Sequence, residues 1–388
     1  MTYFDNAATT FPKPPQVLAA MKHALDEYGG NPGRAGHSLS LKTAEAVFGA
    51  REKCAEFFGA QVEHTIFTLN CTHALNIAVK GIAVPGCHYI ISDLEHNAAA
   101  RPVHALYRAG SASYSVAKTF DDDDRTLKSF ESLINGKTKA VVCTAASNVT
   151  GKILPFKRIA ALCRERGLCF ILDAAQGGGV IPLQIGDGIN FICCSGHKGL
   201  YGPMGTGLLI TDGKYKLRAF AEGGTGSNSR SLDQPEELPD RFESGTINTP
   251  GVIALGAGID FIRKIGIQRI YSHERELCEL FMEEVQKPPS ANSGGDASKV
   301  KLYFDKFDKF DDTRLPLVPF NVEGMESFKT ANLLSEAGFC LRGGLHCSPL
   351  AHKKLGTLET GAARFAPSAF SNKREVMALV RAIRGLRV

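Results

Sequence analysis

A lysine and an aspartate 25 residues apart each follow a short apolar segment of this chain. Asp173 ends the run Cys169–Asp173, and Lys198 lies four residues beyond the run Phe191–Cys194. Short apolar runs of this kind predict buried strands. On neighbouring strands the amine could form a Schiff base with an aldehyde, while the carboxylate kept a pyridine nitrogen protonated, as pyridoxal phosphate chemistry requires. Alternatively, Lys198 is a solvated loop lysine and Asp173 caps a helix.

Two further segments could serve the same cofactor. Asn70–His73 follows a predicted strand and opens a helix, where backbone N–H groups and the Thr72 hydroxyl could bind a phosphate. His96 follows the predicted strand near Tyr89–Ile91 and could place its imidazole flat on a pyridine ring. The alternatives are that Thr72 is an ordinary helix cap and that His96 is a surface histidine.

Helix-like and strand-like segments alternate from about residue 40 to residue 260. Such alternation predicts an α/β fold with a largely parallel sheet covered by helices. Ligands bind such sheets at the carboxyl ends of the strands. Five candidates fall there, namely Thr72, His96, Asn148, Asp173 and Lys198. The expected strands are His64–Thr68, Tyr89–Ile91, Ala140–Cys143, Cys169–Asp173 and Phe191–Cys194, and the expected helices are Thr43–Phe58, Thr72–Val79 and Pro155–Arg166.

The pattern changes after Gly251. A long helical region, Val252–Val285, leads into Lys287–Gly295, whose composition predicts a flexible surface loop. Expected strands and helices then alternate, at Val300–Tyr303, Leu317–Phe320, Ser327–Ala337 and Lys373–Arg384. We therefore predict a large domain of residues 16–255 and a smaller α+β domain of residues 1–15 and 256–388.

Composition narrows the classes of function. A chain of 388 residues with 44% hydrophobic and 22% charged residues can bury one large and one smaller core. Its net charge of +5, without a dense basic block, argues against nucleic acid as a partner. No segment suits a membrane span or a signal peptide. Eleven irregularly spaced cysteines without a Cys-x-x-Cys pair indicate reduced thiols in a cytoplasm, and neither disulfides nor a metal site.

Short motifs along nearly the whole chain match one family in order. They are Asp5–Thr10, Glu95–His96, Ser147–Gly151, Asp173–Gln176, Ser195–Lys198, Phe242–Thr246 and Ala363–Arg364. Together they resemble the cysteine desulfurases and selenocysteine lyases, in the class V aminotransferase group of fold-type I pyridoxal phosphate enzymes. The resemblance implies a large domain with a mixed, mostly parallel sheet and a smaller α+β C-terminal domain.

The resemblance also implies roles around the cofactor, pyridoxal 5'-phosphate. Lys198 would be the Schiff-base lysine, Asp173 would pair with the ring nitrogen, and His96 would stack on the ring. Gln176 and Asn148 would reach the phenolic oxygen or the substrate. The residues implied to bind the phosphate are Thr72, Ser195 and His197.

Two further matches concern the partner subunit and the substrate. A threonine matching Thr246 completes the phosphate site of the other subunit in this family, which implies an obligate homodimer. Arg364 would hold the substrate carboxylate, because a guanidinium group can bind a carboxylate through two hydrogen bonds. Its alternative is a surface arginine near a strand end.

The segment Leu341–Pro349 resembles the Arg-x-Gly-x-His-Cys segment of the SufS-like group II desulfurases. Cys347 would be the nucleophile and Arg342 would lie at the substrate, with Arg342 and His346 favouring the thiolate electrostatically. Group II proteins often carry histidine where this chain has Leu345 and Gly33. These departures leave the substrate and the sulfur acceptor open.

The implied reaction converts L-cysteine to L-alanine and leaves the sulfur on Cys347 as a persulfide, for transfer to a reductant or a sulfur-acceptor protein. The same residues would suit a selenocysteine lyase. A β-eliminating C–S lyase is a further alternative, although elimination needs no protein thiol. An alternative of another class is a sulfur-relay scaffold that binds pyridoxal phosphate but has little turnover.

Overall fold

The computed structural model describes residues 1–33, 36–287, 300–303 and 313–387. The chain forms two compact units, a large unit of residues 13–145 and 154–265 and a small unit of residues 1–12, 146–153 and 266–388. The division therefore comes at residues 12/13 and 265/266, where the sequence suggested 15/16 and 255/256. In addition, Ala146–Ile153 groups with the small unit, because its backbone pairs with Arg314 and Leu315.

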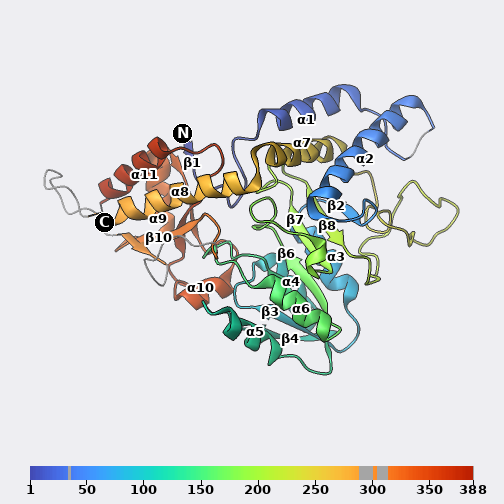
Figure 1. Ribbon diagram of the computed structural model, residues 1–388, viewed down its shortest axis with the longest axis horizontal. Helices are drawn as coiled ribbons and strands as arrows, with labels where there is room; N and C mark the ends of the chain where they lie inside the picture. The colour runs from blue at the N-terminus through green and yellow to red at the C-terminus, as the bar shows by residue number, and fades with distance from the viewer. Residues whose placement is uncertain (34–35, 288–299, 304–312, 388) are drawn as a thin grey trace. The chain divides into compact units, whose positions relative to one another are not determined.

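The large unit contains a seven-stranded sheet and its helices (Figure 1). Its strands are β2 (Thr65–Thr68), β3 (Cys87–Ser92), β4 (Ala112–Ala117), β5 (Thr138–Thr144), β6 (Cys169–Asp173), β7 (Phe191–Ser195) and β8 (Gly207–Thr211). Its helices are α1 (Pro15–Glu27), α2 (Ser38–Phe58), α3 (Cys71–Ile82), α4 (Asn97–Arg108), α5 (Asp123–Glu131), α6 (Phe156–Glu165) and α7 (Thr249–Ile265).

The strand order of this sheet is β2-β8-β7-β6-β5-β3-β4. Neighbouring strands are parallel except at β8, which runs antiparallel to β2 and β7. The other six strands therefore point the same way, and their carboxyl ends share one edge of the sheet. This α/β architecture, with a mixed and mostly parallel sheet, confirms the predicted fold class.

Local signals explain where the elements near this edge begin and end. Every residue of β6 and β7 is buried, which accounts for the apolar runs in the sequence. The helix α3 begins after Asn70, whose side chain accepts a hydrogen bond from the His73 N–H at 2.9 Å. A different helix, α2, ends at Gly59, which adopts a left-handed conformation (φ 62°).

The small unit is an α+β arrangement. Its four-stranded antiparallel sheet has the order β12 (Arg342–Gly344), β13 (Ala362–Phe365), β10 (Val318–Val322) and β9 (Val300–Leu302). A separate parallel pair joins β1 (Thr2–Tyr3) to β11 (Phe339–Cys340). The helices are α8 (Ile267–Gln286), α9 (Ser327–Glu336), α10 (Pro349–Leu355) and α11 (Lys373–Gly385).

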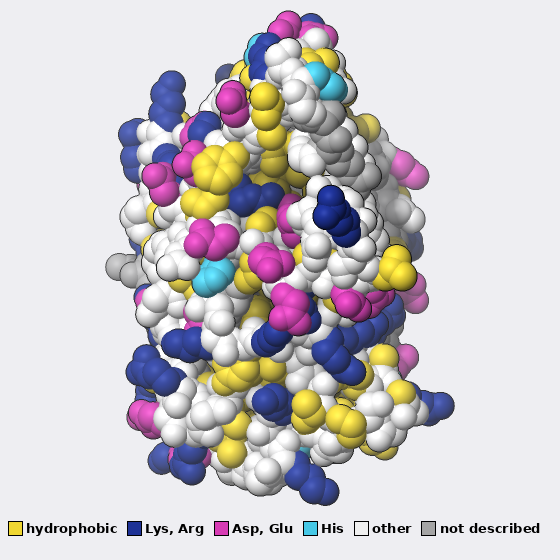
Figure 2. All heavy atoms as spheres, turned by 90° about the vertical axis from the view of Figure 1, so that its right-hand side faces the viewer, with side chains coloured by type: hydrophobic (Ala, Val, Ile, Leu, Met, Phe, Trp, Pro, Cys, Tyr) yellow, Lys and Arg dark blue, Asp and Glu magenta, His cyan; other side chains and the backbone are white. Residues whose placement is uncertain are grey.

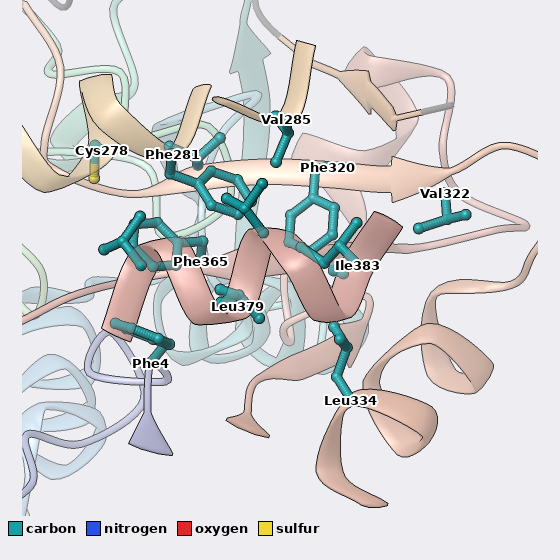
Figure 3. Close-up of a cluster of buried hydrophobic side chains, with 14 of the residues drawn as sticks. Phe4, Cys278, Phe281, Val285, Phe320, Val322, Leu334, Phe365, Leu379 and Ile383 are labelled. Carbon is teal, nitrogen blue, oxygen red and sulfur yellow. The ribbon is translucent and has the colours of Figure 1, made fainter. Parts of the chain in front are cut away.

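A cluster of buried aromatic and aliphatic side chains forms the core of the small unit (Figure 3). Phe281 of α8 stacks on Phe365 of β13, with ring centroids 4.4 Å apart and planes 10° apart. Phe4 packs against the same Phe365 ring, at 4.8 Å between centroids. This contact, with the pairing of β1 and β11, attaches the N-terminal residues to the small unit.

The structure refines several predicted elements. The long helical region is two helices, because Gly266 has a φ of 92° and separates α7 from α8. Strands β4 and β8 were not predicted from the sequence, and β8 is the antiparallel strand that makes the sheet mixed. Most of the predicted loop Lys287–Gly295 lies outside the described residues. Within the described part of the chain, no helix combines the length and the apolar character needed to cross a bilayer.

Candidate active site

The carboxyl edge of the large sheet carries most of the predicted cofactor residues. Strands β6 and β7 are parallel neighbours with Asp173 opposite Cys193. Ser195 ends β7, and Gly196, His197 and Lys198 come next, so the aspartate and the lysine come from adjacent strand ends. Ser195 and Gln176 are buried, and Lys198 is half-buried.

Asp173 is 2% exposed, and its carboxylate accepts hydrogen bonds. Its Oδ1 accepts from the Ala175 N–H at 2.9 Å and from the Cys71 thiol at 3.4 Å. The same thiol is 3.2 Å from the carbonyl oxygen of Cys193. Cys71 thus connects the first turn of α3 to β6 and β7. This role of Cys71 was not predicted from the sequence, although the residue immediately precedes Thr72 in the predicted phosphate-binding segment.

The first turn of α3 and the residues after β7 supply groups suited to an anion. Thr72 is exposed in the first turn of α3, where backbone N–H groups lack partners within the helix. Burial, then the charges of Lys198 and Lys13, lower the pKa of His197 to about 4, so its imidazole is neutral near pH 7. Lys13 donates to the His197 carbonyl oxygen at 2.8 Å. This contact of Lys13 was not predicted from the sequence. The position of Lys13, shortly after the Asp5–Thr10 motif, could have indicated it.

His96 lies at the same edge, after β3. Its Nδ1 accepts from the Ala98 N–H at 3.0 Å and caps α4, which fixes the orientation of the ring. The preceding Glu95 is fully buried, and its Oε1 accepts from the Ser92 hydroxyl at 2.5 Å and the Thr144 N–H at 2.8 Å. Burial raises the pKa of Glu95 to about 8. Glu95 therefore ties the loop that carries His96 to β5.

Thr246 is exposed, in the segment that precedes α7. Its hydroxyl accepts a hydrogen bond from Asn31 Nδ2 at 3.3 Å. Both residues line a cavity of about 490 Å³ that also contains the buried Arg51–Glu243 pair, with N–O distances of 2.6 and 2.8 Å. Figure 2 looks onto this side, that of α2 in Figure 1, and shows apolar side chains interspersed with charged ones.

The small unit contains the second group of candidates, around Arg364 of β13. This side chain is 1% exposed. It donates from Nη1 to the Asn148 carbonyl oxygen and from Nη2 to Asp5 Oδ1, both at 2.8 Å. Its Nε is buried with no hydrogen-bond partner among the described residues. Arg364 therefore has a donor left for a ligand, and it is not a surface arginine.

Cys347 lies in a turn between β12 and α10. Of the eleven cysteines nine are buried, Cys340 is half-buried and Cys347 is exposed. Arg342 Nη2 lies 3.7 Å from the Cys347 sulfur, as expected for a cation next to a nucleophilic thiol. The sequence suggested that His346, like Arg342, favours the thiolate electrostatically. Burial, reinforced by Arg364 and Arg342, lowers the pKa of His346 well below its usual range, so the imidazole is neutral.

Asn148 has different neighbours from those predicted at the strand edge. It groups with the small unit and is 7% exposed. Its Nδ2 donates to the His346 carbonyl oxygen at 2.8 Å, and its Oδ1 accepts from the Ser348 hydroxyl at 2.6 Å. The structure thus brings Asn148, Arg342, Cys347 and Arg364 together in the small unit. The predicted contact of Asn148 with cofactor or substrate stays a prediction.

The chain is similar to proteins of one known family. The Aminotransferase class-V family model matches residues 2–379. The chain belongs to the class-V aminotransferase family. A probable cysteine desulfurase of Methanothermobacter thermautotrophicus is 31% identical over 385 residues, which cover 97% of this chain and 92% of the relative.

Solved structures of cysteine desulfurases are also similar to this chain. The apo cysteine desulfurase of Thermococcus onnurineus superposes with a TM-score of 0.88 at 27% identity, over 99% of this chain and 94% of that one. The cysteine desulfurase CsdA of Escherichia coli gives 0.84 at 26% identity, over 98% and 93%. These similarities cover nearly the whole chain, so each of the two units has a counterpart in the solved structures.

A class-V family member uses pyridoxal phosphate, and the residues of the large unit fit that group. The ring nitrogen calls for a buried carboxylate, which Asp173 provides. The aldehyde calls for an amine, provided by Lys198 on the adjacent strand end. The phosphate calls for hydroxyls and a helix N-terminus, provided by Ser195, Thr72 and the start of α3. Each part of the cofactor thus has a group of matching chemistry at one sheet edge.

Proposed function

We propose that this protein is a pyridoxal phosphate-dependent cysteine desulfurase that converts L-cysteine to L-alanine. One observation carries the proposal: the single exposed cysteine, Cys347, lies next to Arg342 in the same unit as the buried Arg364. A reactive thiol near a carboxylate-binding group suits transfer of sulfur from an amino acid. The names of the relatives above agree with this chemistry.

The large unit would hold the cofactor. Bound pyridoxal phosphate supplies an electron sink that stabilises negative charge at the α-carbon of an amino acid. Asp173 would keep the ring nitrogen protonated, and His96, whose orientation α4 fixes, would cover the ring face. Lys198 would hold the aldehyde carbon and, once displaced by substrate, would move the α-proton. The remaining predicted contacts are those of Thr72, Ser195, His197 and Gln176.

Arg364 would bind the carboxylate of the substrate. Its unpartnered Nε and its buried position give a strong hydrogen bond to an anion, since little water competes there. Asp5 and the Asn148 carbonyl hold the guanidinium in place through its other nitrogens. The substrate amino acid would therefore bind in a defined orientation.

Cys347 would take the sulfur. Its thiolate attacks the substrate sulfur, so a sulfur–sulfur bond forms and the bond between that sulfur and the β-carbon breaks. The electron pair of the broken bond stays with the carbon, which takes up a proton, and the products are alanine and a Cys347 persulfide. Because Cys347 is exposed, a reductant or a sulfur-acceptor protein could then reach the outer sulfur.

The proposal includes a homodimer in a reducing compartment such as the cytoplasm. Thr246 is exposed on the large unit, which suits a residue that completes the phosphate site of a partner subunit. All eleven cysteines are free thiols, which suits a reducing environment.

The test is to incubate the protein with L-cysteine and a thiol reductant, and to measure alanine, sulfide and pyruvate together. We expect equal alanine and sulfide, lost in Cys347→Ala and retained in the control Cys340→Ala. Pyruvate and sulfide without alanine, unchanged in Cys347→Ala, would instead establish a β-eliminating lyase. Turnover of L-selenocysteine alone would establish a selenocysteine lyase, and no turnover of either substrate would leave a cofactor-binding scaffold.

A further inference from the structure

The turn that carries Cys347 has an unusual backbone. His346 and Cys347 have φ values of 49° and 57°, and the nearby Gly344 has 109°. Two consecutive residues with side chains in the left-handed region are uncommon, because the Cβ atom crowds the backbone there. Such a conformation persists only where surrounding contacts hold it.

We propose that Ser348 is a positioning residue that holds the Cys347 turn through Asn148. The inference rests on the proposed function for the role of Cys347, but its geometry stands independently of turnover. Ser348 is fully buried, and its hydroxyl donates to Asn148 Oδ1 at 2.6 Å. Asn148 Nδ2 in turn donates to the His346 carbonyl oxygen at 2.8 Å, on the peptide group that joins His346 to Cys347.

The serine hydroxyl also supports the orientation of the asparagine amide. The His346 carbonyl can only accept a hydrogen bond, so the nitrogen of the amide must face it. The amide oxygen must then face the Ser348 hydroxyl, which donates to it at 2.6 Å. Without this hydroxyl, the buried amide oxygen would lose its donor and the contact that holds the left-handed turn would weaken.

Asn148 also connects the turn to Arg364. The carbonyl oxygen of Asn148 accepts from Arg364 Nη1 at 2.8 Å, while its side chain contacts the turn. A single residue thus sets the position of the thiol turn relative to the proposed carboxylate-binding group. His346 fastens the other side of the turn by donating from Nε2 to the Ala362 carbonyl oxygen at 2.9 Å.

The experiment compares Ser348→Ala with the wild type, both loaded with pyridoxal phosphate and free of substrate. The rate at which iodoacetamide modifies Cys347 is measured from pH 6 to pH 10 by mass spectrometry of the Cys347 peptide. Ser348→Ala should react roughly three- to tenfold more slowly at pH 7, because the relaxed turn moves the thiol away from Arg342. Ser348→Thr, which keeps the hydroxyl, should restore the wild-type profile.

Ser371→Ala is the matched control, since Ser371 is a buried serine of the small unit whose hydroxyl accepts from the Ser368 N–H at 3.0 Å. It should leave the Cys347 profile unchanged. An unchanged profile in Ser348→Ala would overturn the proposal, as would an equal change in Ser371→Ala. Because no turnover is involved, failure of the proposed desulfurase activity would show separately, in the alanine assay. Should Ser348→Ala not fold, Ser348→Gly, which also lacks the hydroxyl that donates to Asn148, takes its place with the same expected and contradicting results.

Discussion

The two groups of candidate residues are held by different physical means. At the sheet edge of the large unit, Asp173, Ser195 and Lys198 lie at or just beyond the ends of buried parallel strands, and the backbone pairing of the sheet places them. In the small unit, Cys347 lies in a left-handed turn held by the side chains of Asn148 and His346.

The two groups should therefore be sensitive to different kinds of substitution. Backbone hydrogen bonds survive most side-chain substitutions, so the sheet edge should lose function mainly when a chemically active group is removed. The turn depends on a few side-chain hydrogen bonds between buried groups, so substitution of a supporting residue should disturb it. The predictions below test this contrast.

The largest effect is expected at Lys198 of the sheet edge. Lys198→Ala removes the amine that would hold the cofactor and move the α-proton, so the turnover number should fall by roughly 10²- to 10⁴-fold. The absorbance of covalently held pyridoxal phosphate should disappear while the circular dichroism of the fold stays unchanged. Lys22→Ala, which removes an exposed lysine paired with Asp26, is the control. Retained activity in Lys198→Ala would contradict its assignment.

Arg364 should come next. In Arg364→Lys a single ammonium group replaces the guanidinium that contacts both Asn148 and Asp5. Charged hydrogen bonds contribute about 1.5–3 kcal/mol, so kcat/KM should fall by roughly 10- to 100-fold, mostly through a higher KM for L-cysteine. Steady-state kinetics measure this change, with the exposed Arg381→Lys as control. An unchanged KM would argue against Arg364 as the carboxylate-binding residue.

Glu95 should make the stability of the fold depend on pH. Its pKa is about 8 in the folded protein, against an ordinary value of 4.5 in the unfolded chain. Between these values unfolding releases its proton, so this carboxyl group lowers stability as pH rises from 5 to 8. The wild type should therefore lose on the order of 3 kcal/mol more than Glu95→Gln over that interval.

Urea denaturation at pH 5, 6.5 and 8 measures this difference, with Glu131→Gln as an exposed control that pairs with Arg166. Parallel curves for the wild type and Glu95→Gln would mean that Glu95 is already ionised in the folded protein. The sheet edge would then contain a buried charge held by the hydrogen bonds of Glu95. It would depend on side-chain hydrogen bonds, as the Cys347 turn does.

The smallest effect should come from Cys71, the thiol beside Asp173. Cys71→Ala removes one weak donor to a carboxylate that keeps the Ala175 N–H, so pyridoxal phosphate should bind roughly two- to tenfold more weakly. Cys169→Ala is the matched control. Cys169 is also a buried cysteine, but it lies at the start of β6, the strand that ends at Asp173. Equal affinities in the two variants, measured by fluorescence titration, would show that the thiol only fills space.

Much of the sheet edge could be predicted from the sequence. Apolar runs predict buried strands, and parallel strands bring the residues that follow them to one edge, so Asp173 and Lys198 were found without coordinates. The strand β8 was missed, since its Gly207–Thr211 run lies close to β7 and no helix separates them. A strand that runs back antiparallel to the strand before it, without a helix in between, does not show the alternation of helix-like and strand-like segments that the prediction used.

The sequence alone determined the types of chemical groups and their order along the strands, because burial and strand periodicity leave a local pattern. Three features could be seen only in the folded chain: Cys71 contacts Asp173, burial keeps His346 neutral, and Asn148 contacts both Arg364 and the Cys347 turn. These facts depend on residues up to 216 positions apart in the chain, and on desolvation, which exists only once the chain has folded around a group.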